Sequence, residues 1–128
     1  MKYIAIFASG DGTNAENVIR ELSASSEARV VLVLTNNPEA GVIKRAQELN
    51  VKSEIISESW NDPDALISVL QANDIHIVLL LGYLKLLPAT VVQKYEGHIV
   101  NLHPALLPQY GGKGMYGHFV HEVVARNH

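Results

Sequence analysis

The sequence of 128 residues contains no cysteine, which excludes disulfide bonds and catalysis by a thiol. It also has no long basic run and a net charge of −3, so a nucleic-acid surface is not expected, although a phosphate pocket is compatible with this charge. The apolar run over residues 75–81 is far shorter than the roughly 20 residues that span a bilayer. The first apolar run is too short for a signal peptide and has no cleavage pattern. We therefore expect a cytoplasmic protein with no membrane partner.

Apolar residues make up 48% of the chain, enough for the core of one domain over residues 1–128. Their periodicity predicts alternating strands and helices. Strands are expected over 2–8, 29–34, 52–56, 75–81 and 97–101, and helices over about 14–23, 41–49, 62–72, 88–94 and 116–126. Strands that are apolar on both faces and alternate with helices are typical of a parallel sheet covered on both sides. The predicted fold class is α/β, Rossmann-like and doubly wound, with a mainly parallel sheet.

A glycine-rich loop, Ser-Gly-Asp-Gly-Thr-Asn over residues 9–14, joins the first predicted strand to the first helix. We expect Thr13 or Asn14 to cap that helix. Glycines allow the backbone to approach a ligand, and a helix N-terminus favours an anion. The loop loosely matches a dinucleotide fingerprint, but the second strand is not followed by the acid that a nicotinamide cofactor needs. A phosphomonoester site and a purely structural turn both remain open.

A second motif, Asn101-Leu-His103-Pro104, follows the end of the fifth predicted strand. Alternate residues of a strand point to the same side, so Asn101 and His103 face one space if the extended geometry continues. An asparagine can donate a hydrogen bond to an oxyanion, and a histidine can carry a proton near neutral pH. The pair suits acyl transfer. The alternative is a strand end whose polar side chains cap a turn.

Three tracts together carry a family resemblance: residues 9–14, residues 80–88 (Leu-Leu-Gly-Tyr-Leu-Lys-Leu-Leu-Pro) and residues 101–110 (Asn-Leu-His-Pro-Ala-Leu-Leu-Pro-Gln-Tyr). The chain resembles the folate-dependent phosphoribosylglycinamide formyltransferases. The resemblance implies transfer of a formyl group from 10-formyltetrahydrofolate to the amine of glycinamide ribonucleotide, without a metal. It implies that the backbone of Gly12, Thr13 and Asn14 holds the substrate phosphate, that Leu84, Lys85, Leu86 and Asn101 bind the folate, and that Asn101 and His103 are catalytic.

The chain departs from that family in several places. Lys85 stands where the family has an arginine, no arginine occurs over residues 60–64, and a glycine-rich segment replaces Pro-Gly after Tyr110. The family continues into further strands and a helix that supply a catalytic aspartate, whereas the only acid after His103 here is Glu122. We therefore expect a formyltransferase-type domain that is incomplete at its C-terminal end and impaired in turnover. An uncovered sheet edge would favour a homo-oligomer.

Two other functions stay open at this point. One is a different folate-dependent formyl hydrolase or transferase, and the other is a non-catalytic phosphate- or nucleotide-binding module. His118 and His121, next to Glu122, lack a third ligand at a recognisable spacing, so no metal is expected. His118 could instead face the substrate site. Lys113 could reach a phosphate from its glycine-rich loop, although a solvated lysine is the simpler interpretation.

Overall fold

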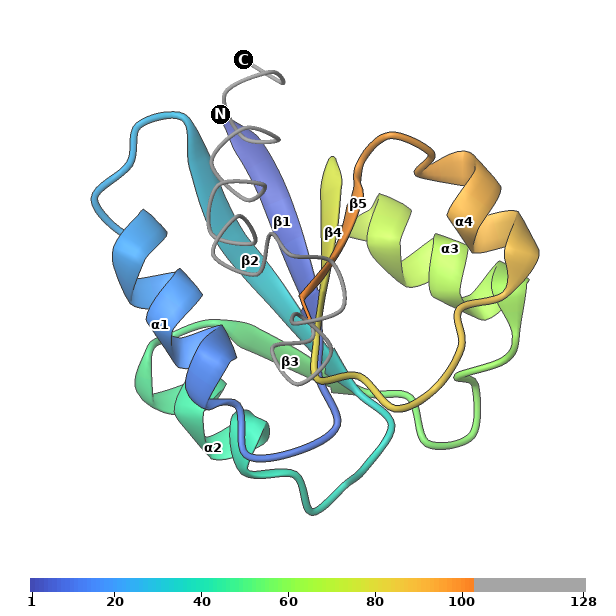
Figure 1. The fold of residues 1–128 in the computed structure, drawn as a ribbon, viewed down its shortest axis with the longest axis horizontal. Helices are drawn as coiled ribbons and strands as arrows, with labels where there is room; N and C mark the ends of the chain where they lie inside the picture. The colour runs from blue at the N-terminus through green and yellow to red at the C-terminus, as the bar shows by residue number, and fades with distance from the viewer. Residues whose placement is uncertain (103–128) are drawn as a thin grey trace, which may run out of the picture.

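A five-stranded parallel sheet forms the centre of the molecule in the computed structural model, which describes residues 1–102 (Figure 1). The strands are β1 (Lys2–Phe7), β2 (Ala28–Thr35), β3 (Lys52–Ile55), β4 (Ile77–Leu81) and β5 (Ile99–Leu102). Their order across the sheet is β3-β2-β1-β4-β5, and every neighbouring pair is parallel. This arrangement confirms the predicted doubly wound α/β fold.

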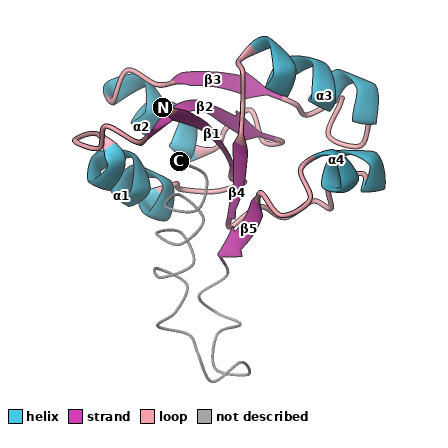
Figure 2. Ribbon diagram, turned by 90° about the horizontal axis from the view of Figure 1, so that it is seen from above, coloured by secondary structure: helices cyan, strands magenta, loops and turns pink. Residues whose placement is uncertain are grey.

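Two pairs of helices cover the two faces of the sheet. Helices α1 (Thr13–Leu22) and α2 (Gly41–Glu48) lie on one face, and α3 (Pro63–Ala72) and α4 (Ala89–Lys94) lie on the other (Figure 2). The chain runs outward from β1 to β3 and then returns to place β4 beside β1. The loops after β1 and β4 therefore diverge to opposite sides at the carboxyl edge of the sheet. In doubly wound sheets this divergence is where ligands bind.

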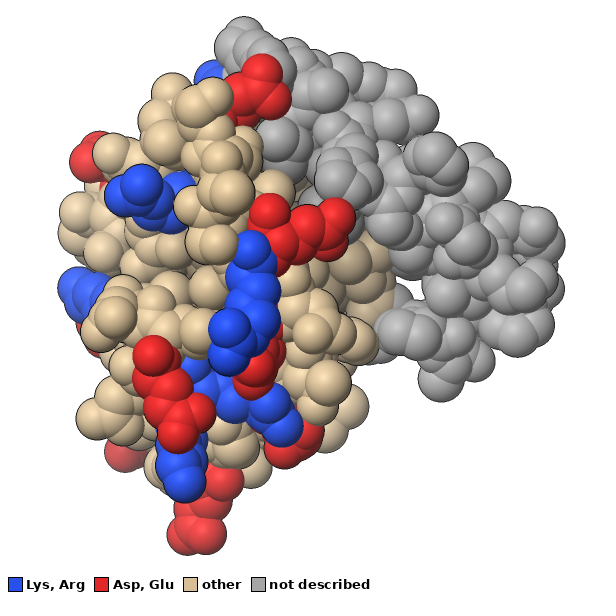
Figure 3. Space-filling view, turned by 90° about the vertical axis from the view of Figure 1, so that its left-hand side faces the viewer, with Lys and Arg blue, Asp and Glu red and all other residues tan. Residues whose placement is uncertain are grey.

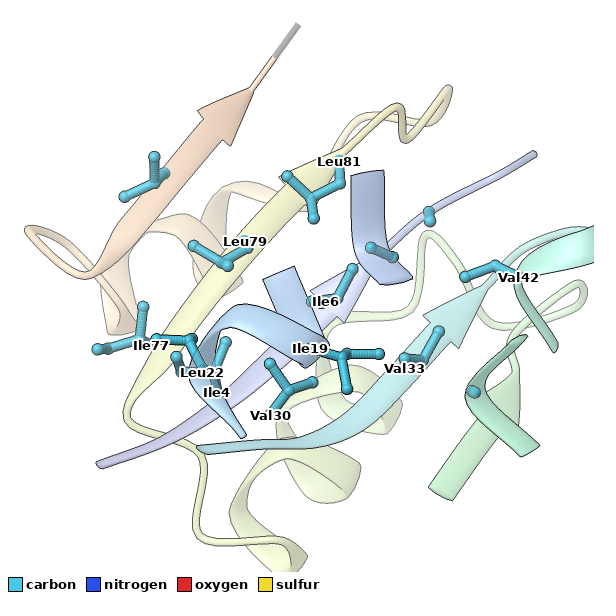
Figure 4. Packing of buried hydrophobic residues seen from close by; sticks show 14 of the residues in the cluster. Ile4, Ile6, Ile19, Leu22, Val30, Val33, Val42, Ile77, Leu79 and Leu81 are labelled. Carbon is cyan, nitrogen blue, oxygen red and sulfur yellow. The ribbon is translucent and has the colours of Figure 1, made fainter. Parts of the chain in front are cut away.

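Two apolar cores share the sheet, one on each face. Side chains of a strand alternate between faces, so Ile4 and Ile6 of β1 pack toward α1 and α2, while Ala5 and Phe7 join the core beneath α3 and α4. Figure 4 shows the first of these cores, where Ile19 of α1 meets residues of the central strands. Burial on both faces explains why β1 and β4 are continuous apolar runs in the sequence.

The two strands on the β4 side of the sheet begin two residues later than predicted. Ile75 precedes β4 because its N–H donates to the carbonyl of Leu70 (3.0 Å) and closes the end of α3. Gly97 precedes β5 because its φ of 81° belongs to a turn rather than a strand. In both places a hydrogen-bonded turn follows the helix before the strand begins, and the apolar pattern of the sequence does not mark where that turn ends.

α3 begins with a side-chain cap, whereas the cap predicted for α1 is wrong. Asp62 caps α3, since its Oδ1 accepts hydrogen bonds from the N–H groups of Asp64 (3.1 Å) and Ala65 (3.2 Å). Neither Thr13 nor Asn14 caps α1. That helix begins at Thr13 itself, after Gly12. The hydroxyl of Thr13 donates to the carboxylate of Asp11, so it is not directed at the helix N–H groups.

Some predictions fall on residues that the structure does not describe. They are the catalytic role of His103, the irregular segment over 104–114 and the helix over 116–126. Within residues 1–102, no helix is both long and apolar enough to cross a membrane.

Candidate ligand site at the carboxyl edge of the sheet

Two hollows lie beside the carboxyl end of β4. The smaller, about 230 Å³, is lined by Gly10, Asp11, Gly12, Thr13, Asn14, Leu81 and Gly82. The larger, about 530 Å³, is lined by Leu80, Tyr83, Leu84, Lys85, Leu86, Leu87, Val92, Glu96, Gly97, Ile99 and Asn101. Leu80 and Leu81 line different hollows because consecutive side chains of a strand point to opposite faces. The two hollows are therefore separated by little more than the end of one strand.

The smaller hollow brings together the three residues predicted to hold a phosphate. Gly12 adopts a left-handed φ of 84° immediately before α1, and its carbonyl accepts the first helical hydrogen bond, from Glu16 N–H (2.8 Å). No side chain among residues 1–102 caps this helix. The N–H groups of its first turn therefore have neither an intrahelical partner nor a side-chain cap, and the positive end of the helix dipole favours an anion there.

Charged side chains surround this glycine loop. The Asp11 carboxylate accepts hydrogen bonds from the Thr13 hydroxyl and from Arg45 Nη2 (2.9 Å). These two donors, the hydroxyl foremost, hold the pKa of Asp11 below its ordinary value. Arg45 was not identified from the sequence, because it lies 34 residues away and no linear spacing connects it to the loop.

The larger hollow brings together all four residues that the resemblance assigns to folate binding. Leu84, Lys85 and Leu86 come from the loop after β4, and Asn101 comes from the end of β5. The side chains of Leu84 and Leu86 are strongly exposed, at 80% and 86%. Exposed leucines around a concave surface provide apolar area for a flat, largely apolar ligand.

Two aromatic residues belong to the surroundings of this hollow: Tyr83 is part of its lining, and Trp60 lies beside the lining residue Lys85. Tyr83 is buried and packs edge-on against Phe7, with ring centroids 5.2 Å apart. Its hydroxyl has no hydrogen-bond partner among the described residues, and burial raises the pKa of Tyr83 to about 12. Trp60 is half-buried against the same core, and the Lys85 ammonium lies 4.5 Å from its ring centroid. This cation–π contact ties the β4 loop to the β3–α3 loop.

Ser9 connects the loops that form both hollows. Its buried hydroxyl accepts a hydrogen bond from Leu84 N–H (2.8 Å) and donates one to Asn36 Oδ1 (2.6 Å). Its N–H donates to the carbonyl of Gly82 (3.2 Å). From the sequence, Ser9 was expected only as the first residue of the glycine loop, with no role of its own. Its position directly after a buried strand was the available signal, because loops after parallel strands meet at one edge.

Only one member of the predicted catalytic pair can be located. Asn101 is exposed, and its position in β5 puts it on the same side as Ile99, toward the larger hollow. His103 lies outside the described residues, as do Lys113, His118, His121 and Glu122. Within residues 1–102, no three histidine, aspartate or glutamate side chains gather as metal ligands would.

The fold and the two hollows define a doubly wound α/β domain with a candidate anion-binding loop after β1 and an apolar recess after β4. The chain belongs to the formyl transferase family, whose sequence model matches residues 2–124.

Several of its relatives are named phosphoribosylglycinamide formyltransferase. It is 37% identical to the chloroplastic phosphoribosylglycinamide formyltransferase of Arabidopsis thaliana and 34% identical to the phosphoribosylglycinamide formyltransferase of Bacillus subtilis, matching 96% and 88% of this chain. The crystal structure of the enzyme of that name from Brucella melitensis superposes with a TM-score of 0.77 at 32% identity, covering 87% of this chain and 61% of that one. The chain spans 44% of the length of the Arabidopsis protein and 60% of the Bacillus protein.

Proposed function

We propose that this chain provides the ligand-binding part of a phosphoribosylglycinamide formyltransferase, which moves a formyl group from 10-formyltetrahydrofolate to the amine of glycinamide ribonucleotide. The observation that carries the proposal is the pair of adjacent hollows at one sheet edge. One is bordered by the N-terminal turn of α1 and suits a phosphate, and the other is apolar and suits a folate. Membership of the formyl transferase family and the name of the Arabidopsis and Brucella relatives support the same assignment.

The chemistry follows from the groups at this edge. The main-chain N–H groups of Gly12, Thr13 and Asn14 would hold the nucleotide phosphate, and the larger hollow would hold the folate. The substrate amine then attacks the formyl carbon, and the carbonyl oxygen gains negative charge. The Asn101 side-chain amide would donate a hydrogen bond to that oxygen. His103 would take the proton from the attacking amine and return one to the departing folate nitrogen. No step of this sequence requires a metal.

The test combines binding with turnover. Calorimetric titration of the chain with glycinamide ribonucleotide and with a folate analogue should show binding of both. In a turnover assay, Asn101→Ala should lower kcat by roughly 10²–10³ while the affinity for the nucleotide stays unchanged. Asn61→Ala, at an exposed asparagine in the β3–α3 loop, is the matched control and should keep full activity.

Two outcomes would overturn the assignment. A nucleotide-binding module would take the nucleotide and ignore the folate analogue. A different folate-dependent formyl enzyme would take the analogue and ignore glycinamide ribonucleotide.

Turnover by these 128 residues alone is a separate part of the proposal. The relatives extend well beyond the matched stretch, and Glu122 is the only acid that follows His103 in this sequence. We propose that the chain binds glycinamide ribonucleotide more readily than it formylates it, because a catalytic histidine ordinarily relies on a carboxylate. A chain extended with the remaining segment of a relative should be faster, and equal rates would refute the need for that segment.

The homo-oligomer and the cytoplasmic location expected from the sequence stay predictions. For the location, the name of the Arabidopsis relative describes that protein as chloroplastic.

A further inference from the structure

Arg45 joins helix α2 to the glycine loop and to the first turn of α1, and all three nitrogens of its guanidinium group donate. Its Nε donates to the main-chain carbonyl of Asp11 (2.8 Å), and its Nη2 donates to the Asp11 carboxylate (2.9 Å). Its Nη1 donates to the carboxylate of Glu16, in the first turn of α1. A planar guanidinium can make these three contacts at once, whereas a lysine ammonium is a point charge on a flexible stem.

The N-terminal end of α2 also supports the loop, through its backbone. The N–H of Val42 donates to the carbonyl of Gly10 (3.1 Å). Gly41 lies so close to Asp11 that an added Cβ would be 3.1 Å from Asp11 Oδ1 and 3.2 Å from its carbonyl oxygen. The glycine loop is therefore held against α2 at consecutive residues, and Arg45 lies one helical turn further along.

Asp11 presents an electrostatic problem at this position. Asp11 is one of the residues that line the smaller hollow, and its side chain is 70% exposed. An aspartate is ionised at neutral pH in any case, and the Thr13 hydroxyl and Arg45 lower its pKa further. A phosphate that enters the hollow therefore meets a like charge at the loop that is expected to bind it, and like charges at close range repel.

We propose that Arg45 is a positioning residue for the phosphate. It offsets the charge of Asp11 and fixes the Asp11 carbonyl, so that the N–H groups of Gly12, Thr13 and Asn14 face an anion. This inference rests on the proposed function, because it takes the smaller hollow as the phosphate site. Figure 3 views the molecule from the side of α1 and α2, where positive and negative side chains lie next to one another, as such local neutralisation requires.

The test uses a charge-removing variant and its electrostatic repair. The dissociation constants of the full chain for glycinamide ribonucleotide, for inorganic phosphate and for a folate analogue are measured at low salt. Arg45→Gln should raise the first two constants roughly threefold or more and leave the third unchanged. Asp11→Asn introduced into Arg45→Gln should return both to within about twofold of the wild type, because the repelling carboxylate is gone. Arg45→Lys should fall between the wild type and Arg45→Gln.

Arg20→Gln is the matched control. Arg20 also pairs with Glu16 (2.8 Å), and its loss changes the net charge equally, but it does not contact the loop. It should leave all three constants unchanged. A merely structural role for Arg45 would weaken folate binding as well and would not be repaired by Asp11→Asn, and either result overturns the inference.

The two proposals fail in different ways. If phosphate binds the wild type and depends on Arg45, but glycinamide ribonucleotide or the folate analogue does not bind, the proposed function fails and the role of Arg45 stands. If both ligands bind and Arg45→Gln changes nothing, the role of Arg45 fails alone. If the wild type binds no phosphate, the inference about Arg45 is overturned.

Discussion

Gly12 is the residue on which the geometry of the smaller hollow depends most directly. Its φ is 84°, and an added Cβ would lie 2.6 Å from the Cβ of Val42. Gly12→Ala should therefore lower the free energy of unfolding by about 1–3 kcal/mol for backbone strain, with a further loss from the overlap. Urea unfolding measures the change.

Gly97 offers a matched control for this prediction. Its φ is 81°, almost the same as that of Gly12, but nothing lies within 4 Å of an added Cβ. Gly97→Ala should show the backbone cost alone, and Gly12→Ala should lose more stability because its new Cβ also overlaps the Cα and Cβ of Val42. Equal losses in the two glycine variants would contradict a steric role for Val42.

Tyr83 gives a prediction for alkaline pH. Burial raises its pKa to about 12, whereas tyrosine in an unfolded chain ionises near pH 10. Below pH 10 both states keep the proton, and this group adds no pH dependence. From about pH 10 to 12 mainly the unfolded state loses it, so the free energy of unfolding should fall by up to about 1.4 kcal/mol per pH unit.

Tyr83→Phe should remove that part of the alkaline loss. Between pH 8 and pH 12, the free energy of unfolding should fall by about 2 kcal/mol less in the variant than in the wild type. Tyr95, whose pKa burial also raises, is present in both chains and cancels in the comparison. At pH 8 the variant should be as stable as the wild type or slightly more so, since the lost hydroxyl has no partner among the described residues. Parallel pH profiles would disprove the role of this phenol.

At the scale of elements, the loops after β1, β2 and β4 converge on Ser9 through Leu84, Asn36 and Gly82. Ser9→Ala leaves the Leu84 N–H without its acceptor, which should cost about 1–3 kcal/mol of stability. Because Leu84 lines one hollow and Ser9 begins the loop of the other, affinity for both the nucleotide and the folate analogue should fall. Ser68→Ala, at an exposed position on α3, should change neither. Loss of affinity for one ligand alone would show that Ser9 does not couple the hollows.

Element positions were largely predictable from the sequence, for physical reasons that differ between elements. Strands buried on both faces, such as β1, are continuous apolar runs, and Asp62 followed by Pro63 is a strong helix start. The start of β4 was missed because Ile75 is as apolar as a strand residue yet its N–H closes the end of α3. The local sequence pattern does not show whether the N–H of such a residue will close the end of a helix or bond to a neighbouring strand.

The sequence motifs named residues of the candidate site, but they did not predict how those residues are arranged in space. Leu84 and Asn101 were assigned to one pocket by resemblance, and the structure places them around one hollow. Ser9 and Arg45 were missed as organising residues, because their partners lie 75 and 34 residues away in the sequence. Such contacts are created by the order of strands in the sheet, which brings the ends of β1, β2 and β4 together.

For the whole molecule, the main property is that two cores share one sheet. β1 contributes Ile6 to the core under α1 and α2 and Phe7 to the core under α3 and α4, and both residues are fully buried. A perturbation of one core therefore reaches the other through a single strand. Small domains built in this way usually unfold in one cooperative transition.

The only tryptophan makes this cooperativity measurable. Trp60 packs with the core under α3 and α4, whereas Ile6 lies in the core on the opposite face. Ile6→Val removes one buried methylene and should lower the free energy of unfolding by about 1 kcal/mol. The urea midpoint from Trp60 fluorescence should shift as far as the midpoint from far-ultraviolet circular dichroism, although the substitution is on the other side of the sheet. Ile55→Val, at a half-exposed position on the edge strand β3, should shift both midpoints far less. A Trp60 midpoint that stayed at its wild-type value while the dichroism midpoint moved would show that the two faces unfold separately. Ligand sites built by elements from both faces would then not be lost in one unfolding transition.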